Sequence, residues 1–285
     1  MVFGLPSCAV RRRIFSRLGG KSPQPLLTAN KASLIEAVAR TYNAIRDFNA
    51  TVDLTPALGS AEKNQITEYK EVRGYIVFRK PSQIRIVGLY PVVRTTAFDM
   101  TSDGSIFQLN LPSKNRFVVG RDQIEQPASS QLENLRPQHF TEALLIKPIA
   151  DPSRVVMENF TDEDNAFYIL HELEERDGQL EQRRTIWFNR VNMTIARQLI
   201  FNDAGDIVSD ARYDEWKSWD NIGFPKHVVV DRPHEEYGVI VDIVKMDINK
   251  GVKDEQFALT RPEGSTLQMI GTDPVPLPAS VTGGK

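Results

Sequence analysis

Residues 74–86, GYIVFRKPSQIRI, contain two short runs rich in β-branched and aromatic residues on either side of Lys80, Pro81 and Ser82. Runs of this kind, bounded by proline and small polar residues, are typical of β-strands separated by a turn. Successive side chains of a strand point to opposite faces of a sheet, so every second residue shares a face. This stretch therefore predicts two strands of a sheet, each with one apolar face.

Similar runs, separated by turn signals such as Ser102-Asp103-Gly104, fill most of the chain after Asn49. Strands are expected at residues 51–54, 65–78, 83–88, 95–101, 105–109, 115–119, 166–174, 182–189, 194–202, 207–216, 224–232, 236–249 and 257–260. One amphipathic helix precedes them. Thr28 or Asn30 can cap this helix, and its apolar residues recur every three to four positions up to Phe48. The pattern predicts an α+β fold that is mainly β, with a mostly antiparallel sheet and a partly helical segment at 122–149.

The composition is that of a globular protein. Of the 285 residues, 41% are hydrophobic and 25% charged, and the net charge of −2 gives no general attraction to nucleic acid. No repeat and no linker divides the chain, so we expect one domain over 28–267 and a disordered tail over 268–285.

The N-terminal residues 1–8, MVFGLPSC, end in the single cysteine of the chain. Ser7 before Cys8, and Leu5 three positions before it, make the segment similar to the lipobox at which bacterial lipoprotein signal peptides are cleaved. Cys8 is therefore a candidate for lipidation, and the basic residues 9–27 would be a flexible tether beside a membrane surface. The alternative is an ordinary N-terminus with a chance cysteine.

Motifs of catalytic chemistry are missing from the sequence. It has no GxSxG elbow, no HExxH, no P-loop and no GxGxxG, and its four histidines are scattered. The acidic run 161–165 lacks the ligand spacing of a calcium loop and is expected to be a solvated turn. Trp187, Trp216 and Trp219 are expected in the core or a cavity wall, because no basic stripe accompanies them. We expect a non-enzymatic protein without metal, cofactor or nucleic-acid partner.

The order of these segments resembles the bacterial lipoprotein-carrier superfamily of LolA, LolB and their relatives, over roughly residues 34–264. The strand at 74–81 ends in a basic residue and proline, and the next carries Ile84, Arg85 and Ile86. A Ser-Asp-Gly turn at 102–104 precedes Ile106 and Phe107. The segment 257–264 is similar to the closing strand and exit of that superfamily.

The resemblance implies a strongly curved, unclosed antiparallel half-barrel whose helices cover a concave apolar cavity for acyl chains. From the alternation of faces, thirteen residues are predicted to line that cavity. They are Val52, Tyr75, Val77, Ile84, Ile86, Phe98, Ile106 and Phe117 on strands, and Leu34, Val38, Ile45, Leu144 and Leu145 on helices. Ordinary solid core is the competing interpretation of the same residues.

The resemblance also suggests roles for a latch and a loop. A basic residue before the strand-end proline ties the sheet to the helical lid in such carriers, which makes Lys80 the candidate latch. Leu89, Tyr90 and Val92 lie in an apolar, proline-containing connection that is a candidate loop for contact with membrane or cargo, or else a buried connector. An anchor at Cys8 fits the membrane-bound LolB-like type better than the soluble one.

The sequence thus predicts a protein that binds and transfers or receives lipids or acylated lipoproteins in the bacterial cell envelope. It would be anchored at the periplasmic face of a membrane, most simply the outer membrane, through Cys8 and the basic tether, and could meet a periplasmic carrier protein. The alternative is a lipoprotein of the same fold that senses lipid or a partner, or acts as a scaffold, without transport.

Overall fold

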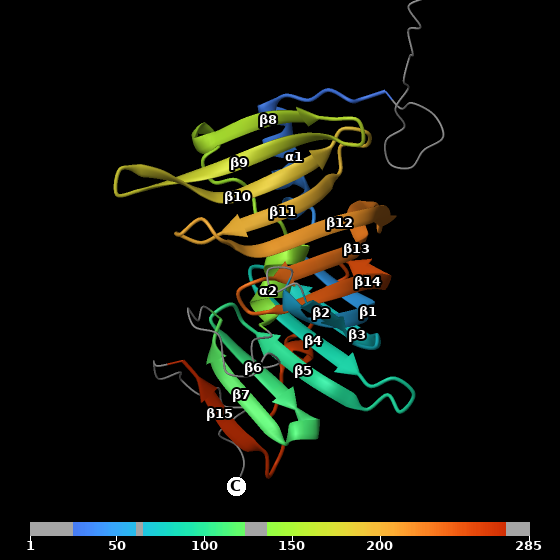
Figure 1. Ribbon diagram of the computed structural model, residues 1–285. Helices are drawn as coiled ribbons and strands as arrows, with labels where there is room; N and C mark the ends of the chain where they lie inside the picture. Colours follow the sequence, from blue (N-terminus) through green and yellow to red (C-terminus); the bar gives the residue numbers. More distant parts are fainter. Residues whose placement is uncertain (1–24, 61–64, 123–135, 272–285) are drawn as a thin grey trace, which may run out of the picture.

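The computed structural model describes residues 25–60, 65–122 and 136–271. A single large, curved sheet dominates them (Figure 1). Its strand order is β15-β7-β6-β5-β4-β3-β1-β14-β13-β12-β11-β10-β9-β8, with β2 paired to β1. The two outermost strands, β15 and β8, do not pair with each other, so the sheet stays unclosed.

The strands follow the chain closely enough that most neighbours in the sheet are neighbours in sequence. Their bounds are β1 (Asp47–Ser60), β2 (Gln65–Glu68), β3 (Val72–Arg79), β4 (Gln83–Leu89), β5 (Thr96–Ser102), β6 (Ile106–Leu111), β7 (Arg116–Arg121), β8 (Val155–Thr161), β9 (Ala166–Arg176), β10 (Gln179–Asn189), β11 (Ile195–Phe201), β12 (Ile207–Trp219), β13 (Ile222–Arg232), β14 (Tyr237–Ile248) and β15 (Thr266–Ile270). All pair antiparallel except β15, which runs parallel to β7. The predicted class, a mainly β protein with an unclosed antiparallel sheet, is confirmed.

Two helices lie against the sheet. Helix α1 (Lys31–Asn43) begins at Asn30, whose side chain accepts a hydrogen bond from the amide of Ser33 and so satisfies one free donor of the first turn. Helix α2 (Pro137–Leu144) starts with proline, which has no amide hydrogen to leave unpaired there. It contacts β4, β5 and β13. Short 3-10 turns lie at η3 (Pro112–Lys114), η5 (Pro152–Arg154) and η6 (Asp254–Phe257).

The concave face of the sheet holds the main core. In β3 and β4, Ile76 and Phe78 pair with Ile86 and Ile84, and all four are at most 1% exposed. Corresponding apolar residues of the strands on both sides join them, and both helices pack into the same cluster. The helices therefore cover the concave face.

The outer, convex face of β3 to β7 is covered by the segment that follows β14. The guanidinium of Arg85 pairs with Asp99 and donates 2.9 Å to the carbonyl oxygen of Ala258. Phe117 and Val119 pack on Leu259 to form a second small core there.

Three predicted elements differ from the structure. The helix ends at Asn43, and Phe48 lies in β1, where its backbone pairs with β3 and β14. Residues 65–78 form two strands instead of one. Residues 257–260 are not a strand, because they cross the convex face after η6; the last strand is β15, and the expected domain limit at 267 falls inside it.

Candidate functional site

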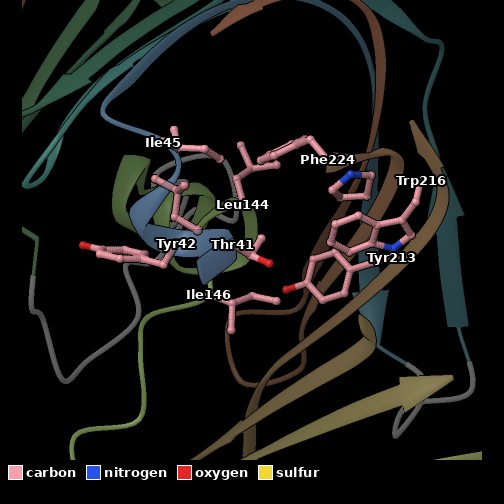
Figure 2. Close-up of a pocket in the computed structure, with 10 residues that line it drawn as sticks. Thr41, Tyr42, Ile45, Leu144, Ile146, Tyr213, Trp216 and Phe224 are labelled. Atoms are coloured by element: carbon pink, nitrogen blue, oxygen red, sulfur yellow. The ribbon is translucent and has the colours of Figure 1, made fainter. Parts of the chain in front are cut away.

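A small cavity lies where α1, α2 and the concave face of the sheet meet. Its volume is about 20 Å³, room for roughly one water molecule and far too little for an acyl chain. Its lining residues are Thr41, Tyr42, Ile45, Leu144, Leu145, Ile146, Tyr213, Trp216, Phe224 and Pro225. Figure 2 shows Tyr213, Trp216 and Phe224 on the side opposite Thr41 and Ile45, with Leu144 and Ile146 between them. Most of the lining side chains are apolar.

Two strands hold the end of α2 through its backbone. The last carbonyls of a helix have no partner within the helix. The hydroxyl of Tyr213 donates a hydrogen bond of 2.8 Å to the carbonyl oxygen of Ala143, and the side-chain amide of Gln198 donates one of 3.1 Å to the carbonyl oxygen of Glu142. These contacts place the end of α2 beside the cavity.

Lysines at both ends tie α1 to the sheet. Lys80 comes directly after β3, and its side chain donates a hydrogen bond of 2.5 Å to the carbonyl oxygen of Tyr42. The Lys80 ammonium also lies 3.6 Å from the centre of the Tyr42 ring. Burial lowers the pKa of Lys80. Lys31 at the start of α1 donates 3.0 Å to the carbonyl oxygen of Val155 in β8.

A buried polar cluster lies under α2. Nη2 of Arg232 donates to Nε2 of His139 at 3.0 Å and to Glu235 at 2.9 Å. The histidine is therefore neutral, with its proton on Nδ1, which is bonded to the Tyr237 hydroxyl. Burial, reinforced by the positive charges of Arg232 and Arg136, holds the pKa of His139 well below its usual range.

Asp122, the residue directly after β7, is a second buried ionisable group on this side. Ser102 donates a short hydrogen bond to one of its carboxylate oxygens. Burial is the larger influence and raises the pKa of Asp122 to about 6. Nearby, Arg136 is 4% exposed and stacks 4.4 Å above the ring of Phe107. Together with His139, these residues give α2 a polar attachment within an otherwise apolar interior.

The described residues contain no cluster of three or more metal-ligating side chains. Within the same parts of the chain, no helix is long and apolar enough to cross a membrane. The interior is an apolar core covered by two short helices.

Comparisons with known proteins bear on the fold. No family model and no curated protein matches the sequence. Among solved structures, a DUF1329 family protein from Desulfovibrio piger matches with a TM-score of 0.51 and 15% identity, over 81% of this chain and 98% of the other. A LolA superfamily protein from Nitrosomonas europaea matches with a TM-score of 0.49 and 12% identity, over 81% of this chain and 99% of the other.

The match to the Desulfovibrio protein is one of fold, and the curved, unclosed sheet with helices on its concave face is the architecture expected from the sequence. The fold of this chain is therefore similar to that of the DUF1329 family protein.

Most of the residues predicted to line the cavity lie on the concave face of the sheet. Phe98 lies at the edge of this core, where its ring covers Gly88 so closely that a Cβ on the glycine would come within 2.3 Å of it. The others belong to the buried core: Val52, Ile84, Ile86, Leu34, Val38, Ile45, Leu144 and Leu145. Ile45, Leu144 and Leu145 also line the small cavity.

Four residues predicted for the cavity lie on the convex face, and for them the prediction is wrong. Tyr75 is 43% exposed, and Val77 lies on the same face of β3, opposite to Ile76 and Phe78. Phe117 and Ile106 pack in the outer cluster with Leu259. The prediction chose the wrong set of alternate residues on these strands, because a shift of one residue exchanges the two faces of a strand.

The candidate latch and the candidate loop are both within the described residues. Lys80 bridges β3 and α1, the two elements that a lid latch would join. Leu89 ends β4, and in the connection to β5 Tyr90 is 39% and Val92 97% exposed, so the connection is not buried. Cys8 and residues 9–24 lie outside the described residues.

The polar cluster under α2 was not predicted from the sequence. His139 is 93 residues from Arg232 and 98 from Tyr237, and no local pattern marks them as neighbours. A histidine two residues after Pro137, in an apolar helical segment, was the available signal. Of the tryptophans, Trp216 lines the cavity, whereas Trp187 lies on the convex face.

Proposed function

We propose that the protein binds acyl chains of lipids or acylated proteins between its helices and the concave face of the sheet, as a non-enzymatic carrier or acceptor in the bacterial cell envelope. The observation that carries this proposal is an apolar concave face covered by two short helices. With 13 and 8 residues, α1 and α2 are too short to be stable alone and depend on packing. An acyl chain can replace that packing, and each buried CH₂ contributes about 0.8 kcal/mol.

Opening requires that α1 move away from the sheet. Lys80 is the proposed latch, because it joins the end of β3 to the last turn of α1 by one hydrogen bond and one cation–π contact. A single lysine lacks the two-pronged geometry of arginine, so it holds the helix less firmly than an arginine at the same position would. Movement of α1 enlarges the existing 20 Å³ cavity, since Thr41, Tyr42 and Ile45 form one of its walls.

The connection between β4 and β5 is the proposed contact with membrane or cargo. Tyr90, Val92 and Val93 are 39, 97 and 67% exposed and lie close together in the chain, and contiguous exposed apolar residues are typical of interaction sites. Leu89 lies beside them at the end of β4. A lipidated Cys8, joined to the domain by the basic residues 9–27, would hold the protein at the periplasmic side of the outer membrane.

The decisive experiment measures ligand uptake. Full-length protein is incubated with a fluorescent fatty acid and with phospholipid, and bound lipid is detected by fluorescence and by native mass spectrometry. Saturable uptake at a stoichiometry near one supports the proposal. Absence of bound lipid after gentle purification from membranes, together with no fluorescence change, contradicts it.

Transfer of a labelled lipoprotein between two membranes separates a carrier from a sensor or scaffold of the same fold. A carrier accelerates the transfer in proportion to its concentration. A sensor binds the label without changing the transfer rate.

A further inference from the structure

The convex face at the β8 end of the sheet has a solvent-open groove of about 420 Å³, a size typical of ligand sites. It lies on the opposite face from Tyr168 and Phe188, which belong to the concave core. Its lining residues are Phe160, Asp162, Asn165, Phe167, Trp187, Ala196, Arg197 and Arg212. The groove is thus separate from the proposed acyl site.

Three aromatic rings form its floor. The ring of Trp187 meets Phe167 edge-on at 5.4 Å between centroids and Phe160 at 6.5 Å. Arg197 lies 5.6 Å above Trp187. All four side chains are only half-buried. Tryptophan and arginine of this kind are the residues that most often dominate binding surfaces.

The charges around the groove favour a basic partner. Arg197 makes two hydrogen bonds of 2.8 Å to Asp210, and Arg212 pairs with Asp210 and Asp231. These two arginines are matched by two aspartates. The exposed turn at 161–165, TDEDN, then adds three acidic side chains at the rim.

The chain itself enters the described structure beside that rim. The amide of Leu27 donates a hydrogen bond of 2.8 Å to the carbonyl oxygen of Arg190. The amide of Arg190 in turn donates one of 2.9 Å to the carbonyl oxygen of Ala166, the residue directly after the acidic turn. The side chain of Arg190 also bonds to Asn159 and Thr161. In Figure 1 the blue N-terminal segment accordingly runs along the β8 end of the sheet.

Residues 9–24, which precede this point, have the complementary chemistry. They contain five cationic and no acidic side chains, and they include Ile14, Phe15 and Leu18. Sixteen residues can extend to about 50 Å at ~3.3 Å each, several times the ~10 Å separation of packed sheets. The segment is therefore long enough to pass around the acidic turn and reach the convex groove.

We propose that this groove binds residues 9–24 of the same chain, with Phe15 against the aromatic floor and the arginines 11–13 near the acidic turn. The proposal does not depend on lipid binding. It identifies the convex aromatic groove as an interaction surface for a basic segment with an aromatic residue.

Photocrosslinking in the full-length chain tests this placement. With Phe15→p-benzoylphenylalanine, irradiation is expected to link position 15 to peptides containing Phe160, Phe167 or Trp187 within a monomer. The charge-neutral variant Asp162→Asn, Glu163→Gln, Asp164→Asn should lower the yield roughly five- to tenfold. Asp162 accepts from the amides of residues 164 and 165 through Oδ1, an oxygen that Asp162→Asn keeps, so the turn geometry is retained.

The same photoreactive residue at Leu277, in the C-terminal segment without basic neighbours, is the matched control. Trp187→Leu should abolish the groove adducts while thermal unfolding shows that the fold persists. Adducts outside the groove, adducts found only between two molecules, or equal yields from positions 15 and 277 would overturn the proposal.

Discussion

The ammonium of Lys80 lies 2.5 Å from the carbonyl oxygen of Tyr42 and 3.6 Å from the centre of the Tyr42 ring. It thereby joins the end of β3 to the last turn of α1, where the helix carbonyls carry partial negative charge. The contact lies next to the cavity that Tyr42 helps to line. In the proposed opening of the acyl site, the strength of this contact determines how readily α1 leaves the sheet.

Lys80→Met should weaken the attachment of α1. Hydrogen bonds to charged groups contribute about 1.5 to 3 kcal/mol when buried, and this half-exposed one should contribute about 1 to 2 kcal/mol to the free energy of unfolding. Hydrogen exchange of the α1 amides should accelerate, and fatty-acid uptake should become faster. Lys245→Met, an exposed lysine on β14, is the control. Unchanged exchange in α1 would show that Lys80 is no latch.

Ile146→Trp should fill the small cavity and compete with an acyl chain. Overpacking costs about 1 to 3 kcal/mol, which the folded state is expected to survive. Affinity for a fluorescent fatty acid should fall at least severalfold. Tyr75→Trp, which adds the same ring on the convex face, should leave affinity unchanged. Equal affinity in both variants would place the ligand elsewhere.

Asp122 should make stability depend on pH. Its pKa is about 6 in the folded protein, against an ordinary value of 3.8. Between these two pH values the folded state therefore keeps a proton that the unfolded state loses. Stability contributed by the protonated form is therefore present below about pH 4 and lost as pH rises through 6. Asp122→Asn should raise the free energy of unfolding by about 2 kcal/mol at pH 7.5 and have little effect at pH 4.

Urea unfolding at both pH values measures this difference. Glu36→Gln, at an exposed carboxylate on α1, is the control variant. His139 acts in the opposite direction, because its lowered pKa disfavours the folded state below about pH 6.5. The comparison is therefore made between variant and parent at each pH. A stabilisation that is equal at pH 4 and 7.5 would argue against a raised pKa.

Replacing Val92 and Val93 together by serine should reduce binding to lipid vesicles without changing stability. Both side chains are largely exposed, so folding gains little from them. Vesicle flotation measures the association, and thermal unfolding checks the fold. Val156→Ser, an exposed valine on the edge strand β8, is the matched control. Equal flotation of all variants would exclude this loop as a membrane contact.

Local pattern was sufficient for the strands, the turns and the class of fold. Alternation in residues 74–86 predicts strands, and the Ser102-Asp103-Gly104 turn forms because Asp103 accepts from the amides of Ser105 and Ile106 while Gly104 adopts a φ of 96°. These interactions span only a few residues. They are encoded in the order of the side chains themselves.

The choice of face required the tertiary structure. Alternation shows that Tyr75 and Ile76 point oppositely but not which of them meets the helices, because the convex face of β6 and β7 also has an apolar cover in Leu259. Three contacts likewise join residues that are far apart in the sequence. Lys80 and Tyr42 are 38 positions apart, His139 and Arg232 are 93, and Leu27 and Arg190 are 163. Such contacts form only when the curved sheet brings distant segments together, so no local sequence pattern specifies them.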